Sequence, residues 1–212
     1  MQQLLIFPYS GTGMEALDCL GDKFKCIGFI SDDKTMIGLR KFGLEIFDRE
    51  ALRRFSKADV LAVPGSPESF LKRKMIIEGL NVEPARYATV IHPGAFVSAN
   101  AQLGKNVLIM AGVVITSNAI IEDNVCILPN AVIHHDTVIG KDTLVGANTT
   151  IAGNVQIGSN CYIGASASIK NGVSVGERCL IGMGANIIGN CQPESKMVGN
   201  PARNLNNNIE VQ

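Results

Sequence analysis

The stretch VIHHDTVIGKDTLVGANTTIAGNVQIG, residues 132–158, places an aliphatic residue at every sixth position. The same spacing extends in both directions, from Ile91 to Ile187, without an interruption. Four positions after each aliphatic residue comes a small or β-branched residue, and the position before that one is mostly Asn, Asp or Gly. Asn, Asp and Gly tolerate the left-handed backbone of a tight corner. Neither the period of an α-helix nor the alternation of a flat strand produces this pattern.

The repeat predicts a β-helix, in which each hexapeptide forms one short strand and one corner with its aliphatic side chain pointing inward. Three hexapeptides, about 18 residues, close one triangular coil, and strand pairing stacks the coils about 4.8 Å apart. Residues 18 positions apart are therefore expected to lie above one another.

The first part of the chain has a different pattern. Short apolar segments at residues 3–7, 25–30 and 58–65 are expected to be strands, and residues 14–21 and 68–80 are expected to be helices. This alternation predicts a small α/β, Rossmann-like subdomain with a mostly parallel sheet. We place the boundary near residues 82–92, which gives an α/β domain over 1–85 and a β-helix domain with a C-terminal cap over 86–212.

Composition excludes several classes of partner. The 19 basic residues balance the 19 acidic residues, so the chain has no excess charge with which to bind nucleic acid or an anionic membrane. No apolar run is long enough to span a bilayer, and the N-terminus does not resemble a signal peptide, so we expect a cytoplasmic location and no membrane insertion. The six cysteines form no CxxC pair and are expected to be small buried residues.

Two N-terminal turns are candidates for ligand binding. Ser10 to Gly13, between a strand and a helix, either binds a phosphate through backbone N–H groups or is a plain turn. Ser31-Asp32-Asp33, after the second strand, either holds a sugar hydroxyl or is a solvated acidic turn.

The repeat also orders the residues around His135. His135 is expected to stack between Ser117 and Gly153, and Asp136 is expected to occupy the corner position. An imidazole suits proton transfer near neutral pH, an aspartate can fix its tautomer, and a glycine N–H can bind an oxyanion, so acyl transfer is one interpretation. A purely conformational role for Asp136 is the other, because Asn, Asp or Gly fill that position throughout.

The other histidines argue against a metal centre. A zinc site of three histidines needs them close together, whereas His92 and His134 are expected on different faces of the coil. His134 is interpreted as an exposed neighbour of His135, and His92 as a structural residue. No metal is predicted.

The repeat, the α/β subdomain, VIHHDTVIG (132–140), IAGNVQIG (151–158) and MVGNPAR (197–203) together resemble one group of acyltransferases. These are the left-handed β-helix, hexapeptide-repeat enzymes, and within them the bacterial nucleotide-sugar N-acetyltransferases of the bacillosamine and perosamine type and the related sialic acid O-acetyltransferases. The resemblance implies a left-handed coil, a homotrimer with active sites between subunits, and acetyl-CoA as co-substrate.

The resemblance also assigns roles to individual residues. It implies that His135 is the general base and Asp136 its orienting partner, and that Gly153 lies at the thioester carbonyl. It places Ala165 and Met183 along the pantetheine arm, and Gly199, Asn200, Pro201 and Ala202 near the far end of the cofactor. It implies that the nucleotide-linked amino sugar contacts Ser10, Gly11, Thr12, Gly13, Ser31 and Asp32.

Two departures from the group concern the acceptor. The group's first turn runs Gly-x-x-Gly-His-Gly, where this chain has Pro8-Tyr9-Ser10-Gly11-Thr12-Gly13, and a second histidine is replaced by Leu144. The resulting prediction is an acetyl-CoA-dependent N-acetyltransferase acting on the 4-amino group of a nucleotide-linked deoxyamino sugar in surface glycan synthesis. The alternatives are O-acetylation of a sialic-acid-like sugar and a non-catalytic trimeric scaffold.

Overall fold

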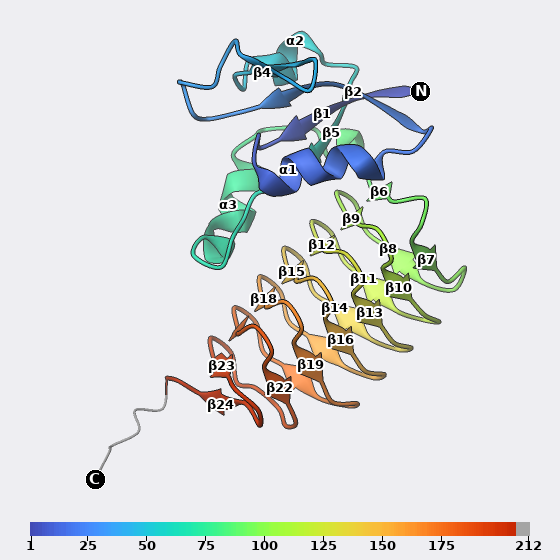
Figure 1. Ribbon diagram of the computed structural model, residues 1–212, viewed down its shortest axis with the longest axis vertical. Coiled ribbons are helices and arrows are strands. Elements are labelled where there is room, and N and C mark those ends of the chain that lie inside the picture. The colour runs from blue at the N-terminus through green and yellow to red at the C-terminus, as the bar shows by residue number, and fades with distance from the viewer. Residues whose placement is uncertain (207–212) are drawn as a thin grey trace.

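The computed structural model describes residues 1–206, which form an α/β layer resting on a tapering column of stacked coils (Figure 1). Residues 207–212 of the predicted C-terminal cap lie outside the described residues. The elements of the α/β layer are β1 (Gln2–Phe7), α1 (Gly11–Glu15), η1 (Ala16–Cys19), β2 (Phe24–Ile30), β3 (Arg40–Lys41), β4 (Leu44–Phe47), α2 (Ala51–Arg54), β5 (Asp59–Ala62), η2 (Phe70–Lys72), α3 (Arg73–Glu78) and η3 (Pro84–Arg86).

The α/β layer is built on one five-stranded sheet of order β3-β4-β2-β1-β5. All pairs in it are parallel except that of the edge strand β3 with β4. The mostly parallel sheet is as predicted, but the β3–β4 hairpin and α2 were not expected from the sequence. The first helix begins at Gly11 rather than Met14, because the Ser10 hydroxyl accepts a hydrogen bond from the Gly13 N–H and caps it.

The column is the predicted β-helix, and its strands form three faces. The docked face consists of β6 (Val90–Ile91), β9 (Leu108–Ile109), β12 (Cys126–Ile127), β15 (Leu144–Val145), β18 (Tyr162–Ile163), β21 (Leu180–Ile181), β23 (Lys196–Val198) and β24 (Arg203–Asn204). The open face consists of β7 (Phe96–Val97), β10 (Val114–Ile115), β13 (Val132–Ile133), β16 (Thr150–Ile151), β19 (Ser168–Ile169) and β22 (Asn186–Ile187). The rear face consists of β8 (Gln102–Leu103), β11 (Ile120–Ile121), β14 (Val138–Ile139), β17 (Gln156–Ile157) and β20 (Ser174–Val175).

The strand register confirms the 18-residue coil. Val132 pairs with Val114 in the preceding coil and with Thr150 in the next one. The aliphatic positions from Ile109 to Ile187 are buried inside the column, where they form one continuous core. The first coil is the exception, since Ile91 is 40% exposed and Val97 and Leu103 are half-buried at the open end of the column, where no coil precedes them.

The corners take the left-handed backbone that the residue types predicted. Asn118, Asp136 and Asn154, which follow one another along one edge, have φ of 60°, 58° and 57°. An L-residue with a longer side chain is strained at such values, whereas Asn, Asp and Gly tolerate them.

The α/β layer packs against the docked face. Outward-facing Leu108, Cys126 and Leu144 share a hydrophobic cluster with side chains of β1, β2 and β5. At the edge of this contact the Asn106 amide continues the pairing of β5, because it accepts from the Ala62 N–H and donates to the Ala62 carbonyl. The docked face is therefore covered over its first coils, and the open and rear faces are not.

Candidate active site

The histidine corner, residues His134 to Thr137, joins β13 of the open face to β14 of the rear face. His135 Nδ1 lies 2.7 Å from Asp136 Oδ2. A carboxylate can only accept a hydrogen bond, so Nδ1 carries the proton and Nε2 keeps its lone pair. The other oxygen of Asp136 accepts from Asn118 Nδ2 at 3.1 Å. The aspartate thus serves both as the corner residue and as the group that fixes the imidazole tautomer.

These contacts affect the charge of Asp136. Its hydrogen bond with His135, followed by that with Asn118, holds the pKa of the Asp136 carboxyl below its usual range. The carboxylate therefore stays ionised beside the imidazole throughout the neutral range. A negative charge in this position stabilises the imidazolium that forms when His135 takes up a proton.

Gly153 lies one coil further along, next to the imidazole, as the repeat predicted. An ideal Cβ on Gly153 would lie only 2.6 Å from His135 Cε1 and 2.6 Å from Nε2, so no larger residue fits without moving the ring. The Gly153 N–H donates no hydrogen bond within residues 1–206. The basic Nε2 of His135 and the Gly153 N–H, which has no hydrogen-bond partner within residues 1–206, therefore lie at the same corner of the column.

Asn171, one further coil along, is a contact that the sequence reasoning missed. Its Nδ2 donates to the Gly153 carbonyl at 2.6 Å. The 18-residue spacing that connects His135 to Gly153 also connects Gly153 to Asn171, so the signal was present in the sequence.

The other two histidines lie apart from this arrangement. His134 is half-buried in the same corner, and its backbone N–H pairs with the Ile151 carbonyl. The His92 imidazole accepts from the Gly94 N–H at 2.8 Å and so stabilises the turn after β6. Within residues 1–206 no three His, Cys, Asp or Glu side chains are grouped so as to hold a metal ion.

Ala165 and Met183 lie on a different edge from His135. With Ala147 they form the alanine corner, a column of residues that joins the docked face to the open face. Ala165 is half-buried, and Met183 is 77% exposed. The full width of the open face separates these two residues from Gly153 in one chain.

The segment Gly199 to Ala202 closes the base of the open face. Asn186 of β22 donates its N–H to the Gly199 carbonyl at 3.0 Å and accepts from the Ala202 N–H at 2.9 Å. Its side chain also donates to the Asn200 side chain at 3.2 Å. The Asn200–Pro201 peptide bond is cis. These residues line the open face at the end far from the α/β layer.

The first N-terminal turn is tightly packed. Gly13 is buried, and an ideal Cβ there would lie 2.2 Å from the Pro8 carbonyl oxygen, so only glycine fits. Because the Gly13 N–H is bonded to Ser10, this residue shapes the turn rather than facing solvent. Gly11 and Thr12 are the more accessible members.

The second N-terminal turn is held by an ion pair. Both oxygens of Asp32 accept from Arg49, at 2.6 and 2.7 Å, and Arg49 also donates to the Gly79 carbonyl at 2.9 Å. Ser31 is buried, and its hydroxyl accepts from the Asp33 N–H at 3.1 Å. Asp32 thus has a cationic partner that the sequence reasoning did not identify.

A cavity of about 230 Å³ lies between the α/β layer and the docked face. Thr12, after β1, and Gly65 and Ser66, after β5, line one side, and Leu144 and Tyr162 line the other. In the strand order β1 lies between β2 and β5, so β1 and β5 flank the switch point of the sheet, where α/β folds bind ligands. Thr12 is the only predicted substrate residue that lines this cavity.

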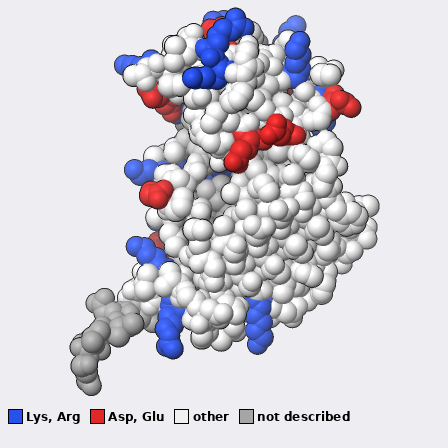
Figure 2. All heavy atoms as spheres, in the orientation of Figure 1, with Lys and Arg blue, Asp and Glu red and all other residues white. Residues whose placement is uncertain are grey.

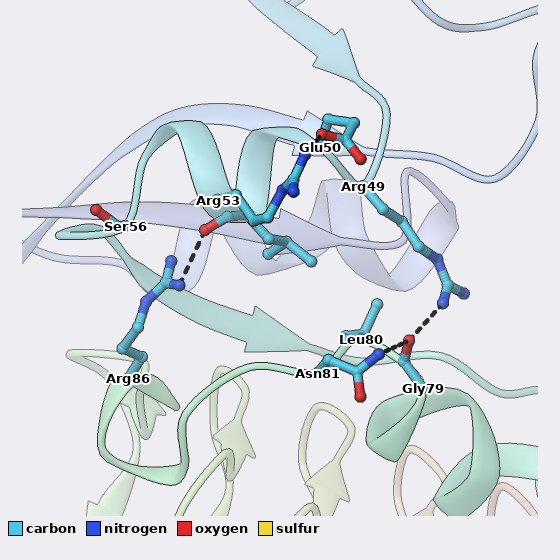
Figure 3. A pocket seen from close by; sticks show the side chains of 9 residues that line it. Arg49, Glu50, Arg53, Ser56, Gly79, Leu80, Asn81 and Arg86 are labelled. Atoms are coloured by element: carbon cyan, nitrogen blue, oxygen red, sulfur yellow. Dashed lines mark hydrogen bonds and ion pairs between the residues drawn. The ribbon is translucent and has the colours of Figure 1, made fainter.

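A larger hollow of about 500 Å³ lies beside α2 and carries three arginines (Figure 3). Arg86 donates to the backbone carbonyls of three residues of the surrounding chain, and Arg49 is committed to Asp32 and Gly79. Arg53 pairs with Glu50. All three guanidinium groups are therefore engaged within the α/β layer, and the hollow offers no uncommitted cation for an anionic ligand.

Two sets of predicted site residues thus lie apart on one chain. The cavity and the alanine corner border the docked face, whereas His135, Asp136 and Gly153 lie at the opposite side of the open face. The structure brings the catalytic candidates together, but it does not bring them to the predicted substrate residues.

Comparison with known proteins identifies the repeat. Residues 100–135, 118–153 and 136–171 match the model of the bacterial transferase hexapeptide, six repeats. No curated protein sequence matches the chain. Within residues 1–206, no helix combines the length and the apolar composition needed to cross a membrane.

Solved structures share the fold over nearly the whole chain. PerB from Caulobacter crescentus, in complex with CoA and GDP-perosamine, is 22% identical with a TM-score of 0.80, covering 96% of this chain and 97% of that one. The acetyltransferase domain of PglB from Neisseria gonorrhoeae is 24% identical with a TM-score of 0.84, covering 97% and 100%. WeeI from Acinetobacter baumannii is 23% identical with a TM-score of 0.79, covering 97% and 100%. The fold is therefore an α/β subdomain followed by a left-handed β-helix, as predicted.

Proposed function

We propose that this chain is an acetyl-CoA-dependent N-acetyltransferase that acts on the 4-amino group of a nucleotide-linked deoxyamino sugar. The observation that carries the proposal is the group at the histidine corner. His135 keeps a basic Nε2 because Asp136 holds Nδ1, and that nitrogen lies beside the bare Cα of Gly153. A general base and an oxyanion donor at one point are the two protein groups that acyl transfer needs.

In the proposed reaction the neutral amine of the sugar attacks the thioester carbonyl, and a C–N bond forms. The Gly153 N–H stabilises the oxyanion of the tetrahedral intermediate. His135 Nε2 takes a proton from the attacking nitrogen, and the imidazolium is stabilised by Asp136. The carbonyl then re-forms as the C–S bond breaks, and the leaving CoA thiolate takes the proton from the His135 imidazolium, which restores the neutral base.

The nature of the acceptor is supported by two observations. The cavity beside Thr12 lies at the switch point of a parallel sheet, which is where α/β folds bind nucleotides. The similar PerB structure holds CoA and GDP-perosamine, a nucleotide-linked amino sugar. We place the reaction in the cytoplasm, since all six cysteines are free thiols, as is usual in a reducing compartment.

The separation of the two groups of residues supports a site made by two copies of the chain. In a homotrimer whose open faces point to the axis, the histidine corner of one subunit meets the alanine corner and the cavity of its neighbour. The outward residues of the open face are uncharged, and Figure 2 shows a broad surface of the column without Lys, Arg, Asp or Glu. Such a surface fits an interface between copies of the chain.

The test is release of free thiol from acetyl-CoA in the presence of a panel of acceptors. The panel contains UDP-, GDP- and dTDP-linked 4-amino sugars and free sialic acid. We expect turnover with at least one nucleotide-linked amino sugar, and mass spectrometry should place the acetyl group on nitrogen. Turnover only on a hydroxyl acceptor would contradict N-acetylation, and failure to bind CoA would support a non-catalytic scaffold.

A further inference from the structure

Asn171 faces the same small space as the imidazole of His135. Its Nδ2 lies 3.1 Å from the position of an ideal Cβ on Gly153, and the same position is 2.6 Å from His135 Nε2. The Asn171 side chain and the imidazole therefore flank the bare Cα of Gly153 from opposite sides.

The fold does not require an amide at this position. Asn171 is the second residue after the aliphatic Ile169, whereas the left-handed position of this corner is Gly172, with φ of 72°. Residues in the same position of other corners differ widely in size and polarity and include Pro129, Lys141, Ala147, Glu177 and Met183. The identity of Asn171 is thus not explained by the coil.

The hydrogen bond to Gly153 determines which way the amide points. The Gly153 carbonyl can only accept, so the nitrogen of Asn171 faces it. The Asn171 oxygen takes part in no hydrogen bond within residues 1–206, and the residue is exposed. The Asn171 oxygen is therefore a hydrogen-bond acceptor that is held next to the proposed reaction centre and has no donor within residues 1–206.

The distance from the thioester to the first amide of an acyl-CoA matches the spacing between the coils of Gly153 and Asn171. Two methylene groups separate the thioester sulfur from the first amide nitrogen of the pantetheine arm, a span of about 4 Å with ordinary bond lengths. Successive coils are about 4.8 Å apart, so a thioester at Gly153 brings that N–H to the level of Asn171. We propose that Asn171 Oδ1 accepts the first pantetheine N–H of the acyl donor while Nδ2 fixes the Gly153 peptide. This role rests on the proposed function.

The experiment compares two small acyl donors on purified full-length protein, with the best acceptor of the panel. S-acetyl-N-acetylcysteamine carries the amide N–H, and its ester analogue has oxygen in place of that N–H. The wild type should use the amide with about five- to tenfold higher kcat/KM, the effect of one hydrogen bond. In Asn171→Leu and Asn171→Ser the preference should disappear, while KM for the sugar stays unchanged.

Gln156→Leu is the matched control, since Gln156 is an exposed amide on the rear face, and it should keep the preference. Equal use of both donors by the wild type, or a preference that survives in both Asn171 variants, would overturn the role of Asn171 alone. Absence of thiol release from acetyl-CoA by the wild type with every acceptor would instead contradict the proposed function.

Discussion

At the scale of single residues, Asp136 combines two demands that the sequence left open as alternatives. Its φ of 58° calls for Asn, Asp or Gly, and its 2.7 Å contact with His135 Nδ1 calls for a hydrogen-bond acceptor. The sequence showed the first demand because it is repeated in every coil. The second depends on the rotamer of a single neighbouring side chain, which no repeat specifies.

Substitution of Asp136 separates these demands. Asp136→Asn keeps a residue that tolerates the corner and should lose only the stabilisation from the charged contact with His135, whereas Asp136→Ala should lose about 1 kcal/mol more for its left-handed backbone. Both variants remove the charge and should lower kcat about tenfold or more. Thermal unfolding and steady-state kinetics measure the two effects, and an Asp136→Asn variant with wild-type kcat would leave only the conformational role.

The pH dependence of stability gives an independent check on Asp136. Because its pKa is lowered in the folded state, the carboxylate stabilises the fold above about pH 4, the usual range of a carboxyl group. That contribution is lost as the pH falls through the lowered value. The difference in melting temperature between wild type and Asp136→Asn should therefore narrow in acid, and a constant difference would argue against the contact.

Gly153 has a matched control in its own column. Gly153→Ala puts a Cβ where His135 Cε1 and Nε2 now lie, so we expect the ring to move and kcat to fall at least tenfold with the fold intact. Gly189, two coils further along the same column, has no atom within 4 Å of an added Cβ. Gly189→Ala should be neutral in the same thiol-release assay, and equal activity of the two variants would show that the approach to His135 is unimportant.

At the scale of elements, the sequence predicted the β-helix well and the α/β layer less well. The same inward aliphatic position recurs in every coil over residues 91–187, so one atypical residue does not change the prediction of the fold. The β3–β4 hairpin and α2 have no such repetition. Two-residue strands such as Arg40–Lys41 bury little and leave no periodic signal, and α2 is only one turn long.

The contact between the α/β layer and the β-helix depends on Arg73. The helical pattern of the sequence did not predict that this arginine is buried. Arg73 has no exposed surface and donates to the carbonyls of Asn124, at 3.1 and 2.6 Å, and of Pro64. Pro64 precedes Gly65 and Ser66, which line the cavity. Figure 1 shows α3, which begins at Arg73, beside the coils, so this side chain connects the cavity loop to the β-helix.

Removing the Arg73 guanidinium should take a nearby positive charge away from the buried Asp142 carboxyl. Arg73→Met leaves buried carbonyls without donors and should cost about 1–3 kcal/mol. Burial raises the pKa of the Asp142 carboxyl, which Asn124 and the positive charge of Arg73 lower in part. A carboxyl with a raised folded pKa loses stability as the pH rises from about 4 through that raised value, and loss of Arg73 extends this range upward.

The Arg73→Met variant should therefore be destabilised more at pH 7 than at pH 4.5. Adding Asp142→Asn, which suits the left-handed corner at φ of 63°, should restore part of the loss at pH 7. Denaturant unfolding of the single and double variants measures this coupling. Additive effects of the two substitutions would show that Arg73 and Asp142 act independently.

At the scale of the whole molecule, the spacing of the repeat placed His135, Asp136 and Gly153 together, but it could not relate them to the α/β layer. That relation depends on which face the layer covers, and the docked face differs from the others in keeping apolar outward side chains, such as Leu108 and Tyr162, over most of its length. In one chain, the cavity and the histidine corner therefore lie on opposite sides of the open face. We therefore propose that acyl transfer takes place between two copies of the chain.

Complementation between two inactive variants tests whether the site is shared between subunits. His135→Ala removes the base, and Thr12→Trp fills the cavity, so each variant alone should have at most about one-hundredth of wild-type turnover. Coexpressed with different tags and purified through both, each mixed trimer combines an intact histidine corner with an intact neighbouring cavity at one of its three sites, which is about a third of the sites. A site shared between subunits predicts thiol release near that fraction of the wild-type rate, and mixed trimers as inactive as the two parents would contradict it.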